Sequence, residues 1–175
     1  RNKLSHMKIE TLVAPTPTIS WREGKVRLID QTKLPLEEEY IETDDYSIVC
    51  DAIMRLAIRG APAIGVAGAY ACVLGANKID TNSLDEFKKS FSQKADEIGE
   101  TRPTAVNLKW AVNKMMNCVQ SFEGEVEELK ENLLQLAHEI REDDLERCHS
   151  LCLHGADVVL EGANVMTVCN TGGLA

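Results

Sequence analysis

The stretch Arg59-Gly60-Ala61-Pro62 combines residue types that can hold a phosphate group. Proline suits the first position of a helix, because its missing N–H would have no partner there anyway. The amides of a first helical turn lack intrahelical acceptors, and the helix dipole makes this end electropositive. With the Arg59 guanidinium beside it, such a helix start can bind an anion. The same residues also fit an ordinary loop before a tightly packed helix of small residues, and the pattern alone leaves both interpretations open.

A second arginine, Arg102, precedes Pro103 in a stretch that again looks like a helix start. We interpret Arg102 either as a second phosphate ligand or as a loop arginine that pairs with a surface carboxylate. Together, Arg59 and Arg102 would supply a basic pocket for a small phosphorylated ligand in a chain whose formal net charge is −9. An acidic surface of this kind disfavours non-specific binding to nucleic acid or to an anionic membrane.

Cys169 is the thiol best placed for chemistry, since it lies where an apolar run meets the glycine-rich stretch Asn170-Thr171-Gly172-Gly173. A nearby helix N-terminus or cation would lower its pKa and enrich the thiolate. Such a group acts as a nucleophile or as a general acid/base. Free cysteine is also among the residue types most often buried, so the residues by themselves favour a buried cysteine at the end of a strand.

The other cysteines and the histidines form no recognisable catalytic or metal-binding set. Six cysteines without a visible secretion signal indicate reduced thiols in a cytoplasmic protein. Cys148-His149 and Cys152 superficially resemble a metal site, but on a helix the two cysteines share a face that His149 does not. No second Cys/His pair stands at zinc-like spacing. We therefore expect no metal and no cofactor.

Length and composition indicate one globular domain with a fragment of another. The chain has 175 residues, of which 44% are hydrophobic and 27% charged. Its longest apolar run, residues 61–76, is interrupted by proline and glycine and is too short for a membrane span. The opening residues 1–7 look like a cloning remnant, with Met7 as the native start.

The elements that would position these residues follow from two hydrophobic periods. Alternation around Glu23-Gly24 predicts a β-hairpin over residues 19–30, and residues 40–42 add a short third strand. From residue 44 onward the period becomes helical. A first helix capped by Thr43 or Asp44 would bury a stripe made of Ile48, Ala52 and Leu56, to which Val49 and Ile53 are the further candidates. Further helices are expected over residues 62–76, 83–98, 103–119, 126–140 and 145–160, with Ser83 as the cap of the second and Gly162 at the end of the last. Helical spacing predicts the buried face of the middle three of these helices. These faces are Leu84, Phe87, Phe91 and Ala95 in the first of the three, Leu108, Ala111, Val112, Met115 and Val119 in the next, and Val126, Leu129, Leu133, Leu136, Ala137 and Ile140 in the acidic one.

The last residues change character again. Residues 165–169 form a short apolar run before a glycine-rich turn, which is how a parallel α/β sheet usually begins. We therefore predict an α+β N-terminal domain over residues 8–162, made of a small antiparallel β-sheet and a helical bundle. Residues 163–175 would be the start, with the first strand, of a truncated α/β domain.

Four segments resemble the methylthioribose-1-phosphate isomerase family, and they occur in the family's order and at similar spacing. They are Ile29-Asp30-Gln31-Thr32-Lys33-Leu34-Pro35, Arg59-Gly60-Ala61-Pro62-Ala63-Ile64-Gly65, Arg102-Pro103-Thr104-Ala105-Val106-Asn107-Leu108 and Cys169-Asn170-Thr171-Gly172. The resemblance implies an aldose–ketose isomerase of methionine salvage, which converts 5-methylthioribose 1-phosphate to 5-methylthioribulose 1-phosphate. It also implies a Rossmann-like C-terminal domain after the N-terminal one and a homodimer of the full-length protein. The superfamily includes two alternatives, the ribose-1,5-bisphosphate isomerases and non-catalytic regulatory subunits.

Carried over by matching positions, the resemblance assigns roles to five residues. Arg59, Gly60 and Ala61 would hold the substrate phosphate with help from Arg102, and Cys169 would be the catalytic cysteine. The family pairs this cysteine with an aspartate that would lie beyond residue 175, so we expect the 175-residue chain to be inactive by itself. The ring opening of a sugar 1-phosphate needs an acid, and a thiol in an apolar pocket keeps its proton. We therefore favour Cys169 as a proton donor.

Overall fold

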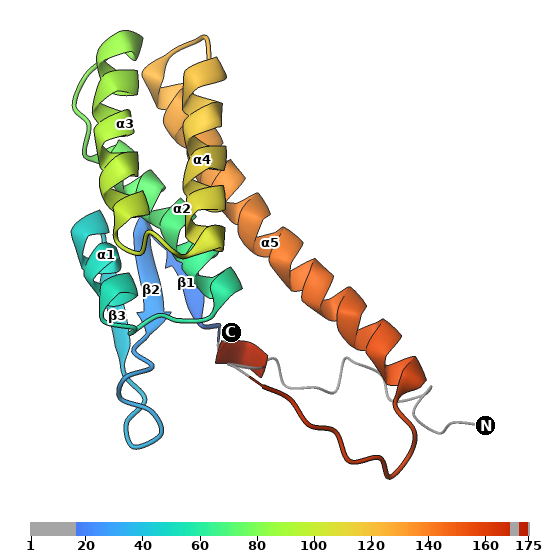
Figure 1. Ribbon diagram of the computed structural model, residues 1–175. Helices are drawn as coiled ribbons and strands as arrows, with labels where there is room; N and C mark the ends of the chain where they lie inside the picture. Colours follow the sequence, from blue (N-terminus) through green and yellow to red (C-terminus); the bar gives the residue numbers. More distant parts are fainter. Residues whose placement is uncertain (1–16, 169–171, 175) are drawn as a thin grey trace.

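The computed structural model describes residues 17–168 and 172–174, and it combines one small sheet with five helices (Figure 1). Strands β1 (Ile19–Arg22), β2 (Lys25–Ile29) and β3 (Tyr40–Thr43) form an antiparallel sheet in the order β1-β2-β3. The predicted hairpin and third strand are confirmed. Both turn residues of the hairpin have positive φ, 47° at Glu23 and 82° at Gly24, which is the conformation that matches the twist of two paired strands.

Helix α2 (Ala61–Asn77) lies at the centre of the molecule, and every residue from 63 to 76 is buried. It contacts the four other helices as well as strands β1 and β2 (Figure 1). Small residues make this position possible because they let neighbouring helices approach closely. At Gly68, for example, an added Cβ would lie 2.5 Å from Cδ1 of Leu108 in α4.

The remaining helices surround α2 and are α1 (Tyr46–Met54), α3 (Leu84–Glu100), α4 (Val106–Ser121) and α5 (Val126–Val158). The predicted cap at Ser83 is confirmed, since its side chain accepts a hydrogen bond from the amide of Glu86. The apolar faces predicted for α3, α4 and the first half of α5 are buried, apart from Leu84 and Leu136, which are half-buried. None of the described helices is long and apolar enough to cross a membrane.

The predicted helices differ from the structure in the cap and the buried stripe of α1 and in the first residues of α4 and α2. Helix α1 is capped by Asp45 instead of Thr43 or Asp44, and Ile48 and Leu56 are 43% and 41% exposed. Ala52 is buried as predicted, and so are the further candidates Val49 and Ile53, which Cys50 joins. Leu56 lies beyond the end of α1 and has a φ of 65°, so the helical spacing does not determine the direction of its side chain. Helix α4 starts at Val106, four residues after Arg102, and α2 starts one residue before Pro62.

The region from 126 to 158 is one continuous helix instead of the two predicted ones. Nothing between residues 140 and 145 breaks it, since Arg141-Glu142-Asp143-Asp144 contains neither glycine nor proline. The second half of α5 runs past the rest of the bundle (Figure 1), and Leu151 is 73% exposed there. Over residues 165–168 the predicted strand is not formed, because no strand in the described part of the chain pairs with these residues. A second domain over residues 163–175 stays a prediction.

Candidate functional site

Arg59 and Gly60 lie in the short loop that leads from α1 into α2. The loop is anchored by Ala57 and Ile58, which are fully buried. The amide of Ile58 donates to the carbonyl of Ala52 at 3.1 Å, and the carbonyl of Ala57 accepts from the amide of Gln31 at 2.9 Å. The loop is therefore tied both to α1 and to the end of the sheet, so the start of α2 has a fixed place.

Gly60 is the N-cap residue of α2, with φ 97° and ψ 132°. A side chain would strain this backbone conformation, so the position favours glycine. The cap provides no side-chain hydrogen bond to the helix. Ala61 and Pro62 form the first turn, and the carbonyl of Gly60 accepts from the amide of Ile64 at 3.0 Å. The backbone amides of Ala61 and Ala63 precede the first intrahelical bond, so this end of α2 offers N–H donors and a positive dipole.

Among the described residues, one hydrogen-bond partner holds the exposed side chain of Arg59 beside this helix start. Its Nε donates to Oε1 of Gln31 at 3.2 Å. A guanidinium has five N–H donors, so this bond leaves the four N–H groups on the two terminal nitrogens. A fork of donors next to an uncapped helix N-terminus can bind a phosphate or a carboxylate.

The half-buried Arg102 lies in a turn that precedes α4, and the carbonyl of Arg102 accepts from the amide of Ala105 at 2.9 Å. The first halves of α2 and α4 pack closely: a Cβ at Gly65 would lie 3.2 Å from the backbone oxygen of Asn107. Because Gly65 meets Asn107 and Gly68 meets Leu108, the two helices begin on the same side of the molecule. The structure thus brings the loops of Arg59 and Arg102 to one end of the α2–α4 pair.

A groove of about 280 Å³ adjoins the starts of these two helices. Pro62, Val106 and Trp110 give it an apolar side. Helix α5 adds a charged side on which Arg147 donates to Asp143 at 2.9 Å. Burial raises the pKa of Asp144, also in this wall, and the neighbouring carboxylate of Asp143 raises it further.

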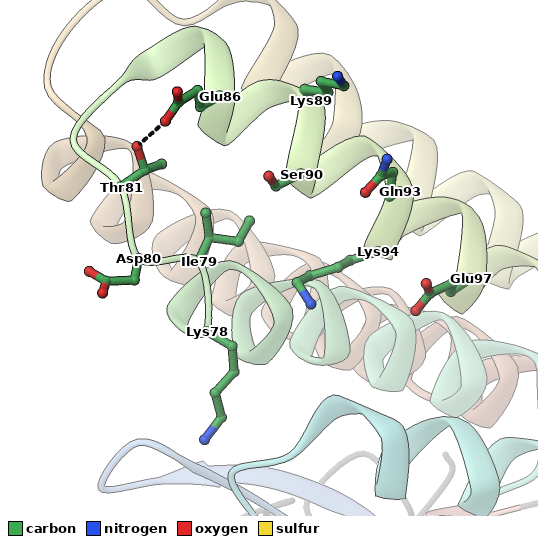
Figure 2. Close-up of a pocket in the computed structure, with 10 residues that line it drawn as sticks. All are labelled: Lys78, Ile79, Asp80, Thr81, Glu86, Lys89, Ser90, Gln93, Lys94 and Glu97. Carbon is green, nitrogen blue, oxygen red and sulfur yellow. Dashed lines mark hydrogen bonds between the residues drawn. The ribbon is translucent and has the colours of Figure 1, made fainter.

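A second groove, of about 620 Å³, lies at the opposite end of α2, between the α2–α3 loop and α3 (Figure 2). Its charges are of both signs and several are engaged. Lys78 pairs with Asp44 at 3.3 Å, and the ammonium of Lys94 lies 4.7 Å from the ring centroid of Tyr46. This surface offers no concentrated charge for an anionic ligand, so we assign it no role.

Of the residues singled out in the sequence, Cys169 lies outside the described part of the chain. Sequence reasoning also missed one residue of this region, Gln31, although it belongs to a segment that carries the resemblance. Its contact with Arg59 crosses from the end of the sheet to the helix start, and no local pattern in the sequence reports such a contact.

Fold and sequence together define the class of protein. Residues 57–175 match the model of the Initiation factor 2 subunit family, and the chain belongs to this family. Its curated relatives include the methylthioribose-1-phosphate isomerases of Geobacter metallireducens, 46% identical over 159 residues, and of Synechocystis, 43% identical over 160 residues. Both matches cover 90% of this chain and 46% of the relative, so the chain spans about half the length of these relatives. The resemblance stated from the motifs is confirmed.

Two solved structures have the same fold as this chain. The 5-methylthioribose 1-phosphate isomerase of Pyrococcus horikoshii is 34% identical with a TM-score of 0.87, and the match covers 92% of this chain and 46% of that one. Subunit delta of the translation initiation factor eIF-2B from A. fulgidus is 41% identical with a TM-score of 0.81, and the match covers 90% of this chain and 46% of that one. The predicted N-terminal architecture, a small antiparallel sheet with a helical bundle, is therefore confirmed.

Proposed function

We propose that this chain is the N-terminal half of an aldose–ketose isomerase that converts 5-methylthioribose 1-phosphate to 5-methylthioribulose 1-phosphate. The observation that carries the proposal is the identity of 43–46% to methylthioribose-1-phosphate isomerases along 90% of the chain. In this proposal the substrate phosphate lies at the start of α2, against Arg59 and the backbone of Gly60 and Ala61. Arg102, from the loop at the same end of the helix pair, assists.

The proposed substrate sets a particular chemical task. Its anomeric carbon carries a phosphate ester, so the ring does not open freely to an aldehyde as in an ordinary aldose. A proton donor has to assist opening of the furanose ring while the phosphate is held, and a hydrogen then passes from C2 to C1. We assign the acid/base work on this half of the protein to Cys169. General acid catalysis of this kind contributes about a hundredfold to ten-thousandfold in rate.

Because the chain spans about half the length of its relatives, we propose that the 175 residues alone are inactive. The full-length protein would act as a cytoplasmic homodimer. Sedimentation of the full-length protein tests the oligomeric state, and a fractionated cell extract tests the location. Turnover by the purified 175-residue chain would contradict the proposal that it is inactive.

The direct experiment is turnover of methylthioribose 1-phosphate by the full-length protein and its variants. Cys169→Ser should reduce kcat by about a hundredfold or more, whereas Cys152→Ser, an exposed thiol on α5, should leave it unchanged. Arg59→Ala should raise KM with a smaller effect on kcat, and Arg22→Ala, at the exposed end of β1, serves as its control. Full activity of Cys169→Ser would remove the catalytic assignment, and an unchanged KM of Arg59→Ala would remove the phosphate site.

A second candidate function is favoured by the identity of 41% to subunit delta of a translation initiation factor. In that case the chain would belong to a non-catalytic regulatory subunit that binds a phosphorylated ligand at the same helix start. A sister activity, isomerisation of another 1-phosphorylated pentose such as ribose 1,5-bisphosphate, uses the same phosphate contacts. Turnover of both sugar phosphates by one preparation separates these cases: a regulatory subunit converts neither substrate, and the sister isomerase prefers ribose 1,5-bisphosphate.

A further inference from the structure

Gln31 is a buried amide that joins three separate segments of the chain. It lies two residues after the end of β2, and 1% of its surface is exposed. A buried amide without hydrogen bonds would destabilise the fold, so its partners report what it holds together. Those partners belong to the loop before α2 and to the C-terminal turn η3 (Gly172–Leu174).

The orientation of this amide follows from the chemistry of its neighbours. Oε1 accepts from Nε of Arg59 at 3.2 Å, and a guanidinium can only donate. Nε2 donates to the carbonyl of Leu174 at 3.0 Å and, at a longer 3.5 Å, to the carbonyl of Arg59. In the opposite orientation Nε2 would face the Nε donor of Arg59, and Oε1 would face the carbonyl oxygens of Leu174 and Arg59. The first orientation therefore is the one that satisfies all three groups.

Gln31 is itself held in place by its own backbone and by its neighbour along the chain. Its amide donates to the carbonyl of Ala57 at 2.9 Å. The preceding residue, Asp30, accepts from the Arg55 guanidinium at 2.9 Å and from the Thr32 hydroxyl at 2.6 Å. The side chain of Gln31 therefore extends from a rigid turn, which is what a residue that orients another side chain requires.

The C-terminal turn is fixed by a second bond as well. The hydroxyl of Thr18 donates to the carbonyl of Gly173, next to the residue whose carbonyl Gln31 holds. In sequence this turn directly follows Cys169-Asn170-Thr171. One amide thus connects the residue proposed to bind phosphate with the turn that follows the proposed catalytic segment.

We propose that Gln31 is a positioning residue that orients the Arg59 guanidinium for phosphate binding and ties the turn Gly172–Leu174 to the same loop. The proposal rests on the proposed function, in which Arg59 is a substrate ligand. The bond through Nε restricts a long side chain and leaves the terminal nitrogens for the anion, so less ordering is needed when the ligand binds. Gln31 itself need not touch the substrate.

The test is a cycle of KM measurements on the full-length protein with methylthioribose 1-phosphate. Gln31→Met keeps the length of the side chain and removes all its hydrogen bonds, and we expect KM to rise about five- to tenfold, the effect of one lost hydrogen bond. In the Arg59→Ala background the same change should leave KM unaltered, because the residue through which it acts is gone. An equal rise in both backgrounds, or no rise in either, overturns the proposal. Gln120→Met is the matched control, since the Gln120 amide donates to Ser92 on an exposed helix face at 3.2 Å.

Gln31→Glu covers the case in which the methionine variant does not fold. The carboxylate keeps the acceptor for Nε, pairs with the guanidinium and competes with phosphate, so binding of inorganic phosphate measured by calorimetry should weaken by about tenfold or more. Unchanged phosphate affinity overturns the proposal. If the wild type binds inorganic phosphate but does not convert methylthioribose 1-phosphate, the proposed reaction fails while the calorimetric comparison still tests Gln31. A wild type that does not bind phosphate overturns both.

Discussion

The Arg55 guanidinium donates through Nη1 to Oδ2 of Asp30 at 2.9 Å, and this ion pair joins the residue after β2 to the C-cap residue of α1. The other carboxylate oxygen accepts from the amide of Thr32 at 3.0 Å and from its hydroxyl at 2.6 Å. Burial raises the pKa of Asp30, but the hydrogen bonds from Thr32 and Arg55 together outweigh it, so the pKa lies below its usual value of 3.8. The turn that carries Gln31 is thus fixed by a carboxylate that stays charged.

Asp30→Asn should lower the free energy of unfolding by about 1–2 kcal/mol at neutral pH, since the ion pair joins a buried carboxylate to a partly exposed guanidinium. Because the folded state lowers the pKa of Asp30, its stabilisation is present above the unfolded pKa of about 4 and is lost as pH falls through the folded value. Urea unfolding at a series of pH values should show a constant difference between wild type and variant above about pH 5, and a shrinking one below about pH 4.

The control for this comparison is Asp80→Asn, an exposed carboxylate in the α2–α3 loop. It should change the free energy of unfolding by less than about 0.5 kcal/mol at any of these pH values. If the difference in the free energy of unfolding between wild type and Asp30→Asn did not shrink in acid, the charge of Asp30 would not be what stabilises the turn. The side chain would then act by packing.

Gly68→Ala should destabilise the protein by about 1–3 kcal/mol. The added methyl group would lie 2.5 Å from Cδ1 of Leu108, which is fully buried, so this side chain would have to shift within a close-packed core. The gain in helix propensity, about 0.5–1 kcal/mol, is too small to compensate. Gly155→Ala in α5 is the matched control, because nothing lies within 4 Å of its added methyl group, and it should stabilise by that same gain. If denaturant unfolding gave Gly68→Ala a free energy of unfolding equal to or higher than that of Gly155→Ala, α2 and α4 would pack less closely than this distance indicates.

Glu23→Asn should stabilise the hairpin between β1 and β2. Glu23 is exposed and has a φ of 47°, a conformation in which asparagine is less strained than glutamate, and Gly24 already supplies the second turn residue. A gain of about 0.5 kcal/mol in the free energy of unfolding is expected. Glu123→Asn, an exposed glutamate after α4, controls for the change in charge. Equal effects of the two substitutions would assign the gain to charge alone.

Local patterns in the sequence were sufficient for the elements that local chemistry determines. Glu23-Gly24 predicted the hairpin, Ser83 predicted the cap of α3, and a helical stripe beginning at Leu108 predicted the buried face of α4. Each of these depends on residues within a few positions of one another. Where the outcome depended on distant partners, the same reasoning failed: residues 165–168 have the composition of a strand but pair with none of the strands among residues 17–168 and 172–174.

The candidate site divides in the same way. Arg59 was singled out because Pro62, close to it along the chain, predicts the start of a helix, and α2 does start there. Gly60 and Ala61 were assigned to the site through the family resemblance. The contact from Gln31 to Arg59 spans 28 positions in sequence, so no periodicity or cap signal could report it. The role of Cys169 stays a prediction, since the residue lies outside the described part of the chain.

The hydroxyl of Tyr70 in α2 lies 3.0 Å from Nδ1 of His138 in α5, and the ring of Trp21 stacks on Tyr70 with 5.6 Å between centroids. Tyr70 is 1% exposed, and burial raises its pKa to about 12, so the hydroxyl stays protonated and needs a partner. His138→Leu should therefore cost about 1–3 kcal/mol, because it leaves a buried hydroxyl unpaired.

Tyr70→Phe should cost less, about 1 kcal/mol, because the half-buried His138 can turn to water for its hydrogen bond. The double variant Tyr70→Phe/His138→Leu should be no less stable than His138→Leu alone, since both polar partners are then replaced by apolar groups. Urea unfolding of the four proteins measures this coupling. Additive losses in the double variant would mean that His138 stabilises α5 through its ring packing, independently of the Tyr70 hydroxyl.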